Sequence, residues 1–218
     1  MTGVQTCALP IYTSVVAREG TTVFMVPLGT PGFRIGKVFN KAGWRFYQNA
    51  ELIFENARVP HANVVGEPHK GQKVRSGVAA EFSDFELAAN ALGICDAAVE
   101  NAMQYAKKET RAGKKLYDHQ LVQLNIHEMH MLTEALRSYV MRCAWDMDTK
   151  VHGSLSPVLV MAYASDVLQR VTKLNMDVHG TRGGMMDAMT QKLVRDGIIW
   201  THLAGDNTQR LKAVRRMK

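Results

Sequence analysis

The amino-acid sequence predicts an α+β fold in which a small antiparallel β segment precedes an up-down four-helix bundle. Between residues 12 and 59 apolar side chains alternate with a period of two, which is typical of half-buried strands. From residue 78 to residue 147 they recur in steps of three and four, which is typical of helices with one apolar face. Ser156 and Pro157 then open a further helix, because serine suits an N-cap and proline suits the first helical turn.

Composition argues against a membrane-spanning protein and against a disulfide-rich or cysteine-based metal-binding one. At 46% hydrophobic residues over 218 positions, the chain can bury a sizeable core. No apolar run approaches the ~18 residues of a membrane span, so we expect no such span. Cys95 and Cys143 lie on apolar helix faces and Cys7 stands apart, which indicates reduced, buried thiols of a cytosolic-type protein rather than a disulfide framework or a metal site. A cytoplasmic, bacterial-type location is our default expectation, because the natural N-terminus, which would carry a targeting signal, is expected to be missing.

The N-terminal segment differs in kind from the rest. Residues 1–11 match the translation of a sequencing adapter codon for codon, with GTG read as the start. We therefore expect the natural reading to begin near Tyr12 and the chain to be a gene fragment. A segment that was never selected to pack here should be disordered or loosely extended.

The β segment contains three expected strands, over residues 22–27, 34–39 and 48–59. Residues 12–17 are a candidate for another. Residues 61–71 are rich in proline, glycine and asparagine and read as a linker to the helices.

Two long helices follow, separated by a basic break. Their apolar positions are Val78, Phe82, Phe85, Ala89, Leu92, Cys95, Val99, Ala102 and Ala106, then Val122, Ile126, Met129, Leu132, Leu136, Val140, Cys143 and Met147. Within the break, Gly113 suits a left-handed C-cap and Asp118 suits the N-cap of the second helix. The pattern predicts an antiparallel helix pair with a basic tip.

The remaining helices are shorter. A third is expected from Ser156 to about Val178, a glycine-rich loop over residues 179–184, and a fourth helix from Asp187 to Leu203. Residues 204–206 break the pattern. Residues 207–217 can form a last basic helix, which we expect to dock on the protein rather than to bind nucleic acid.

Five cations gather at the tip of the helix pair: Lys107, Lys108, Arg111, Lys114 and Lys115. Their charge has the right sign for a phosphate group. The alternative is a solvated helix end whose cations suit the negative end of the helix dipole. The residues alone favour this alternative.

Five short motifs, taken together, are specific. They are Asn49–Pro60 (NAELIFENARVP), Gly113–Gln120 (GKKLYDHQ), His179–Gly183 (HGTRG), Arg195-Asp196 and Gln209-Arg210. In them the chain resembles the acyl-CoA dehydrogenase family. The first is similar to the last strand of that family's middle β-domain, the second to its FGKxLxxHQ turn, the third to its HGGxG loop, and the last two to its RD and QR pairs.

The resemblance implies a domain organisation. Residues 12–60 would be part of the middle β-domain, residues 61–71 the linker, and residues 72–218 the C-terminal four-helix bundle. The N-terminal helical domain and the first strands of the β-domain would be missing, and the piece by itself would be inactive.

The resemblance also implies a function. The parent would be an FAD-dependent flavoprotein of fatty acid metabolism that oxidises an acyl-CoA thioester at Cα–Cβ to the 2-enoyl-CoA. A carboxylate would take the α-proton while flavin N5 takes the β-hydride. The expected partners are the acyl-CoA substrate, further copies of the chain in a homo-oligomer (tetramer or dimer), and electron-transfer flavoprotein as a candidate acceptor; no nucleic acid and no metal are expected.

The family motifs assign candidate cofactor-binding residues: Arg111, Gln120, Gly180, Gly183, Asn207 and Gln209. In the family a residue of the turn at 111–120 reaches the FAD of a neighbouring subunit. With the resemblance, the phosphate-binding interpretation of Arg111 and Gln120 becomes the favoured one.

The chain departs from the family at the catalytic base. The two positions where members carry the catalytic glutamate are Ser83 and Ala204 here. The nearest acids are Asp206, which follows a glycine break and can point into a cleft, and Asp84, which is rotated by about 100° from the expected helical direction. A structural role is the alternative for both, as an N-cap for Asp206 and as a solvated or salt-bridged residue for Asp84.

Two other function classes stay open. One is a flavin monooxygenase or oxidase of the same fold. The other is a non-catalytic helical interaction protein, which is favoured by Glu109, by Asp177 and by the missing glutamate, since the family usually has arginine and glutamine at the first two positions.

Overall fold

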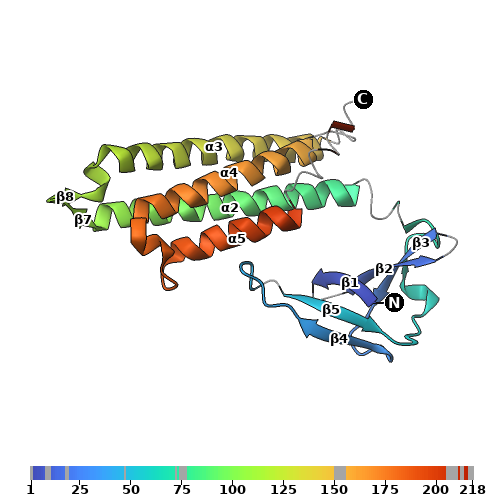
Figure 1. The fold of residues 1–218 in the computed structure, drawn as a ribbon. Coiled ribbons are helices and arrows are strands. Elements are labelled where there is room, and N and C mark those ends of the chain that lie inside the picture. Colours follow the sequence, from blue (N-terminus) through green and yellow to red (C-terminus); the bar gives the residue numbers. More distant parts are fainter. Residues whose placement is uncertain are drawn as a thin grey trace. The chain divides into compact units, whose positions relative to one another are not determined.

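A computed structural model describes residues 2–7, 11–17, 20–46, 48–71, 73, 78–149, 156–204, 211 and 214–215. Its contacts divide the chain into two compact units, Met1–Ala80 and Glu81–Lys218. The first unit holds most of the strands, and the second holds most of the helical residues and a short two-stranded hairpin (Figure 1). Each unit is considered by itself.

The first unit consists of two small antiparallel sheets. In one, β5 (Asn49–Phe54) lies between β1 (Thr2–Cys7) and β4 (Phe33–Val38). In the other, β3 (Gly20–Val26) lies between β2 (Ile11–Ala17) and β6 (Val64–Val65). Val26, Phe33 and Leu52 form a small core, where the rings of Phe33 and Phe54 stack at 4.8 Å.

The strands predicted at 22–27, 34–39 and 48–59 are confirmed as β3, β4 and the shorter β5, and the candidate at 12–17 as β2. The expectation that residues 1–11 are loosely extended is wrong for Thr2–Cys7, which pairs with β5 from Thr2↔Ile53 to Cys7↔Asn49. A physical reason is that an open strand edge offers unpaired N–H and C=O groups to any extended segment. The linker at 61–71 contains a short 3-10 helix, η1 (His61–Asn63), and β6.

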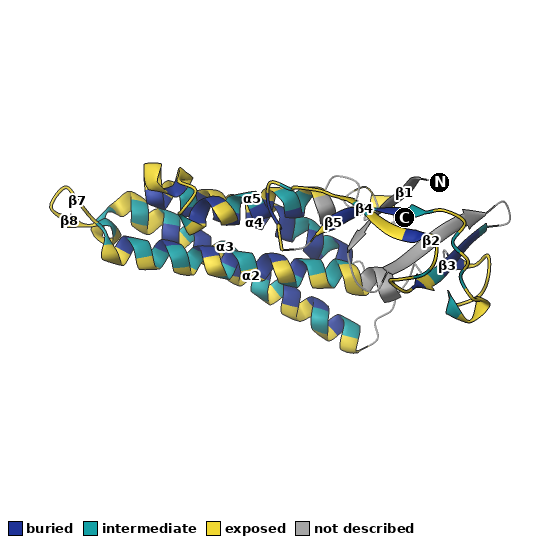
Figure 2. Ribbon diagram, turned by 90° about the horizontal axis from the view of Figure 1, so that it is seen from below, coloured by how far each residue is buried: buried dark blue, intermediate teal, exposed yellow. Residues whose placement is uncertain are grey.

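Four helices run up and down in the second unit, and this confirms the predicted fold class (Figure 1). They are α2 (Val78–Lys108), α3 (Gln120–Asp148), α4 (Ser156–His179) and α5 (Met189–Ala204). Buried side chains line the sides on which the helices face one another (Figure 2). The fourth helix begins two residues later than predicted, and most of the expected last helix lies outside the described residues.

The buried side chains are small along α2 and large on the other helices. Five alanines of α2 are fully buried, at positions 88, 91, 98, 102 and 106, whereas Met129, Leu136, Leu168 and Trp200 fill the space on the other three helices. Alternating small and large side chains fill an interior densely. Phe82, which the pattern placed on the apolar face, is 55% exposed.

Polar contacts fix the order of the helices. The Trp200 indole N–H donates to the Leu87 carbonyl at 3.1 Å, which joins α5 to α2. Arg170 forms two hydrogen bonds with the Glu128 carboxylate at 2.6 and 2.8 Å, which join α4 to α3. Cys95 and Cys143 are reduced and buried, as predicted, and burial raises the pKa of the Cys95 thiol to about 12.

The break between the first two helices differs from the prediction. Gly113 has the expected positive φ of 80°, but it lies in a β-hairpin turn rather than at a helix C-cap. The N-cap of α3 is His119 and not Asp118, because Leu116–Asp118 forms a 3-10 turn, η2, ahead of the helix. None of the described helices is both long and apolar enough to cross a membrane.

Candidate functional site

A basic β-hairpin extends the helix pair at the C-terminal end of α2. Strands β7 (Thr110–Arg111) and β8 (Lys114–Lys115) pair antiparallel, and Ala112 and Gly113 connect them with φ of 49° and 80°. Positive φ at both central residues is the geometry of a type I′ turn, which matches the twist of a two-stranded hairpin. The Leu116 N–H donates to the Glu109 carbonyl at 2.9 Å and closes the base of the hairpin.

The cations of the hairpin donate hydrogen bonds to backbone carbonyls. Lys115 Nζ donates to the Lys108 carbonyl at 2.9 Å, and Lys114 Nζ donates to the Asp118 carbonyl at 3.1 Å. Arg111 donates to the carbonyl of its neighbour Thr110. Within the described part of the chain, none of these three cations forms a salt bridge with a carboxylate, so the hairpin presents uncompensated positive charge to solvent.

The start of α3 lies directly behind the hairpin. His119 Nε2 is 3.1 Å from the Arg111 carbonyl, which fixes the hairpin against the helix. The His119 side chain makes no cap hydrogen bond to α3, and Gln120 is the exposed first residue of the helix. The first amides of a helix have no intrahelical partner and attract anions.

The glycine-rich loop forms a short 3-10 helix, η3 (Gly180–Gly184), between α4 and α5. Gly180 has a φ of 57° and is exposed, with no atom within 4 Å of the place where a Cβ would stand. At Gly183 a Cβ would lie 3.0 Å from the Met176 carbonyl oxygen and 3.1 Å from the His179 Cβ. The two glycines therefore differ: Gly180 leaves an open face, and Gly183 permits close packing.

Hydrogen bonds hold this loop in one shape. Arg182 binds the Asp187 carboxylate through two hydrogen bonds at 2.6 and 2.8 Å, and the guanidinium holds the pKa of that carboxyl below its ordinary value. The Thr190 hydroxyl donates to the Gly183 carbonyl at 2.7 Å. Because the charge of Arg182 is compensated by Asp187, the cations available to an anion come from the hairpin.

The hairpin and the loop lie at the same end of the bundle (Figure 1). Tyr105, in the last turn of α2, stacks on His179, the last residue of α4, with 3.9 Å between ring centroids. Of the predicted cofactor-binding residues, Arg111, Gln120, Gly180 and Gly183 belong to the elements gathered here.

The predicted acid Asp84 lies elsewhere. It is on the first turns of α2 described by the structure, about 36 Å along the helix from Lys108 at 1.5 Å per residue, where it interacts with another group. Asp206, Asn207 and Gln209 lie outside the described residues. Sequence reasoning missed the pairing of Tyr105 with His179, because no spacing rule connects two residues so far apart in the chain.

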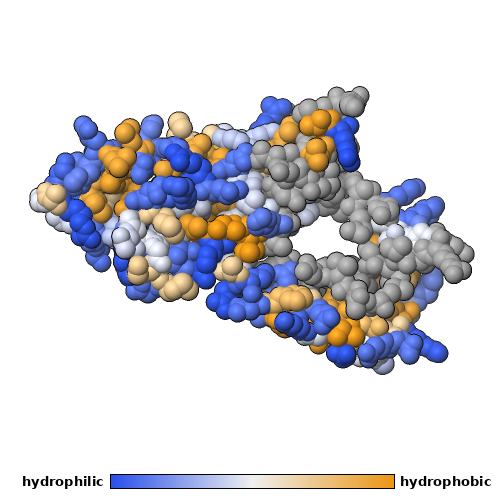
Figure 3. All heavy atoms as spheres, in the orientation of Figure 1, coloured by the Kyte–Doolittle hydropathy of each residue, from blue (hydrophilic) through white to orange (hydrophobic). Residues whose placement is uncertain are grey.

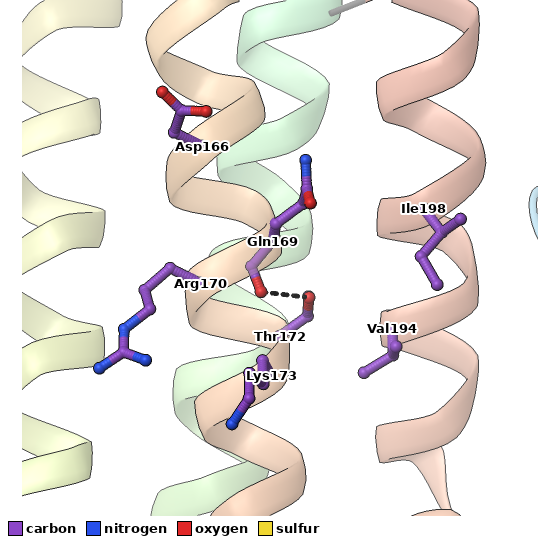
Figure 4. Close-up of a pocket in the computed structure, with 7 residues that line it drawn as sticks. All are labelled: Asp166, Gln169, Arg170, Thr172, Lys173, Val194 and Ile198. Carbon is purple, nitrogen blue, oxygen red and sulfur yellow. Dashed lines mark hydrogen bonds between the residues drawn. The ribbon is translucent and has the colours of Figure 1, made fainter. Parts of the chain in front are cut away.

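A separate cavity lies on the side of the bundle. It has a volume of about 440 Å³ and is lined by Asp166, Gln169, Arg170, Thr172, Lys173, Val194 and Ile198 (Figure 4). Its α4 wall is polar and its α5 wall is apolar. It contains none of the predicted site residues, and Arg170 is directed away from it toward Glu128. The described residues bring together no cluster of histidine, cysteine, aspartate and glutamate that could hold a metal ion.

Comparisons with known proteins find relatives that match most of this chain. The short-chain specific acyl-CoA dehydrogenase of Megasphaera elsdenii is 32% identical over 193 residues, which cover 88% of this chain and 50% of that protein. The acryloyl-CoA reductase (NADH) of Anaerotignum propionicum is 33% identical over 181 residues, which cover 83% of this chain and 46% of that one. The chain thus spans about half the length of these relatives.

The solved structures and a family model add to these matches. The structure of butyryl-CoA dehydrogenase from Megasphaera elsdenii superposes with a TM-score of 0.86 at 28% identity, over 95% of this chain and 55% of that one. The model of the acyl-CoA dehydrogenase C-terminal domain matches residues 80–217, which contain the four helices except for the first two residues of α2, together with the hairpin and the glycine loop. The chain therefore belongs to the acyl-CoA dehydrogenase family.

Proposed function

We propose that residues 12–218 are the C-terminal part of an FAD-dependent enzyme that oxidises an acyl-CoA thioester at Cα–Cβ. The observation that carries the proposal is the meeting of the uncompensated hairpin cations with the glycine loop at one end of the bundle. Relatives named for acyl-CoA oxidation support the substrate class.

The donor set at this end fits the diphosphate of FAD. Arg111 is exposed, as are Lys114 and Lys115, and a guanidinium or ammonium group binds phosphate oxygens through charge-assisted hydrogen bonds. Gln120 stands at the helix N-terminus beside them, where backbone N–H groups are available. The bare face of Gly180 would let a ligand approach the backbone closely, and Gly183 would keep the loop packed on α4.

When bound, the flavin supplies the hydride acceptor of the reaction. The part left to this chain is proton removal from the substrate α-carbon. Asp206 is our first candidate base and Asp84 the second, since Ala204 and Ser83 occupy the positions of the family glutamates. A carboxylate within hydrogen-bond reach of the α-proton can act as a general base.

A homo-oligomer, tetramer or dimer, is part of the proposal because α3 carries a second apolar stripe. Leu124, Met131 and Trp145 are 64%, 52% and 56% exposed and are spaced by multiples of seven residues. They lie on the side of α3 opposite to the buried Met129 and Leu136. Apolar side chains also reach the surface elsewhere along the bundle (Figure 3). A seam of this kind suits a second helix of the same type.

Electron-transfer flavoprotein remains our proposed electron acceptor. A structure whose subject is the electron transferring flavoprotein of Acidaminococcus fermentans, with mention of flavin-based electron bifurcation, superposes on this chain with a TM-score of 0.86 at 26% identity. This likeness supports the fold, and the printed subject of that structure supports our choice of acceptor.

The experiment that tests the proposal is purification of the complete gene product and measurement of bound flavin. We expect a stoichiometric flavin that is FAD rather than FMN, because the hairpin cations suit a diphosphate. Purified protein that contains FMN, or that takes up no flavin when FAD is added, would refute the proposal.

A further inference from the structure

We propose that Tyr105 and His179 are positioning residues, whose stacked rings set the spacing between the β7–β8 hairpin and the η3 loop. The inference rests on the proposed function only in naming FAD as the ligand that the hairpin and the loop bind together. The stack itself is defined by geometry: the ring centroids are 3.9 Å apart, with 25° between the ring planes. At this separation the two rings are in van der Waals contact.

Tyr105 controls the root of the hairpin through its backbone. Its carbonyl accepts a hydrogen bond from the Glu109 N–H at 2.9 Å, and the Glu109 carbonyl in turn accepts from the Leu116 N–H at 2.9 Å. The first bond lies at the end of α2, and the second closes the base of the hairpin. A displacement of Tyr105 would therefore be passed to both strands, which carry Arg111 and Lys114.

His179 controls the glycine loop in the same way. It is the last residue of α4 and the residue that caps η3. Its Nδ1–H donates to the Asn175 carbonyl at 2.9 Å, which fixes the plane of the ring. Its Cβ lies 3.1 Å from the place where a Cβ of Gly183 would stand, so His179 packs closely against the loop backbone.

Among the hydrogen bonds and ion pairs of the described residues, none joins the hairpin to the loop, so the stack is a direct link between α2 and α4 at this end. The hydrogen bonds of Arg182 and Thr190 hold the loop to the start of α5, and those of Lys115 and His119 hold the hairpin to itself and to α3. The pKa of the Arg182 guanidinium is raised mainly by its hydrogen bond to Asp187 and, to a smaller extent, by Tyr105. Through the stack, the Tyr105 side chain connects α2 with the residue that begins the loop.

The imidazole is suited to this role when it is neutral. His179 is buried, with 8% of its surface exposed. Burial lowers its pKa, and the positive charge of Arg182 lowers it further. The aromatic stack places apolar ring faces together, and such a pair contributes more to stability than the burial of its area alone. A phenyl ring at position 179 would keep the stack and lose only the bond to Asn175.

The first test is amide hydrogen exchange on the complete protein without flavin. His179→Ala changes a residue on α4, and we expect it to speed exchange in residues 109–116 on the far side of the stack. Tyr105→Ala should speed exchange in residues 180–184. The conservative variants His179→Phe and Tyr105→Phe should restore wild-type exchange, and unchanged exchange across the stack in both alanine variants would overturn the inference.

The second test is flavin affinity in the same variants. Each alanine variant should bind FAD roughly tenfold more weakly, the double variant no more weakly than either single one, and the phenylalanine variants as tightly as wild type. Additive losses would mean that the two rings act separately and would overturn the inference. If an alanine variant fails to fold, Tyr105→Leu or His179→Leu keeps the apolar volume without a ring and takes its place.

These two tests separate the inference from the proposed function. A wild-type protein that binds no flavin would refute the proposed function, and the exchange experiment would still decide whether the rings position the loops. A protein that binds flavin with equal affinity in all variants would leave the proposed function standing and overturn the inference.

Discussion

The identity of the catalytic base is decided at single residues. In the complete protein we predict that Asp206→Asn lowers the rate of flavin reduction by acyl-CoA by about 10²- to 10⁴-fold, the range that general-base catalysis contributes, while FAD stays bound. Anaerobic stopped-flow spectroscopy of the flavin measures this rate. If reduction persists in Asp206→Asn and fails in Asp84→Asn, the order of the two candidates is reversed. If it persists in both, neither residue is the base.

Arg111 is the hairpin residue with the clearest predicted effect. Its guanidinium is bound only to a backbone carbonyl among the described residues, so it is free to bind a phosphate oxygen. A charged hydrogen bond contributes about 1.5–3 kcal/mol, so Arg111→Gln should weaken FAD binding by about ten- to hundredfold. Lys37→Gln, which removes an exposed cation from β4, is the matched control and should leave the dissociation constant for FAD unchanged.

His179 makes stability depend on pH. Because burial holds its pKa in the folded state below the ordinary value of 6.5, the unfolded state takes up the proton first as the pH falls. Stability is therefore lost as the pH drops below about 6.5 and is unaffected by this residue above it. The melting temperature of wild type should fall more steeply on acidification than that of His179→Phe. Parallel curves for the two proteins would contradict a buried neutral imidazole.

At the scale of the element, α3 carries two apolar faces with different roles. The inner face packs the bundle, and the outer stripe of Leu124, Met131 and Trp145 is exposed in the single chain. We predict that the double variant Leu124→Glu, Met131→Glu converts the oligomer of the complete protein to a smaller species in analytical ultracentrifugation. Leu28→Glu, at an exposed turn of the first unit, is the control and should not change the sedimentation coefficient. An unchanged oligomer in the double variant would exclude this seam.

Periodicity predicted the helices well because one side of each must be buried. Leu136, Val140 and Cys143 recur in steps of four and three, and all are buried. The break between α2 and α3 was predicted less well. Gly113 indicated a positive φ, but nothing in the sequence indicated one at Ala112, because alanine rarely adopts its φ of 49°. The hairpin requires a positive φ at both residues. His119 replaced Asp118 as N-cap because a 3-10 turn occupied the preceding residues.

The candidate site was predictable in part. Arg111, Gln120, Gly180 and Gly183 could be chosen from the motifs, which describe local sequence. Their arrangement depends on a tertiary contact, the stacking of Tyr105 on His179, and tertiary contacts between distant residues leave no periodic signal. The direction of Asp84, offset by about 100° from the family position, stays a prediction from helical geometry.

At the scale of the whole molecule, the chain spans about half the length of its relatives, and its own residues divide into two units. Our proposal assigns the diphosphate-binding end of the cofactor site to the second unit. We expect the 218-residue chain by itself to retain no FAD and to be inactive, because a cleft that needs further walls cannot exclude water from a bound flavin.

The most direct measurement is the visible absorption spectrum of the complete, purified gene product under anaerobic conditions, before and after a panel of saturated acyl-CoA thioesters of increasing chain length is added. We predict an oxidised FAD spectrum that is bleached by at least one of these thioesters, with the matching 2-enoyl-CoA as product. A protein whose bound flavin is reduced by dithionite but by none of the thioesters would contradict acyl-CoA oxidation, and a colourless protein would contradict the flavin site itself.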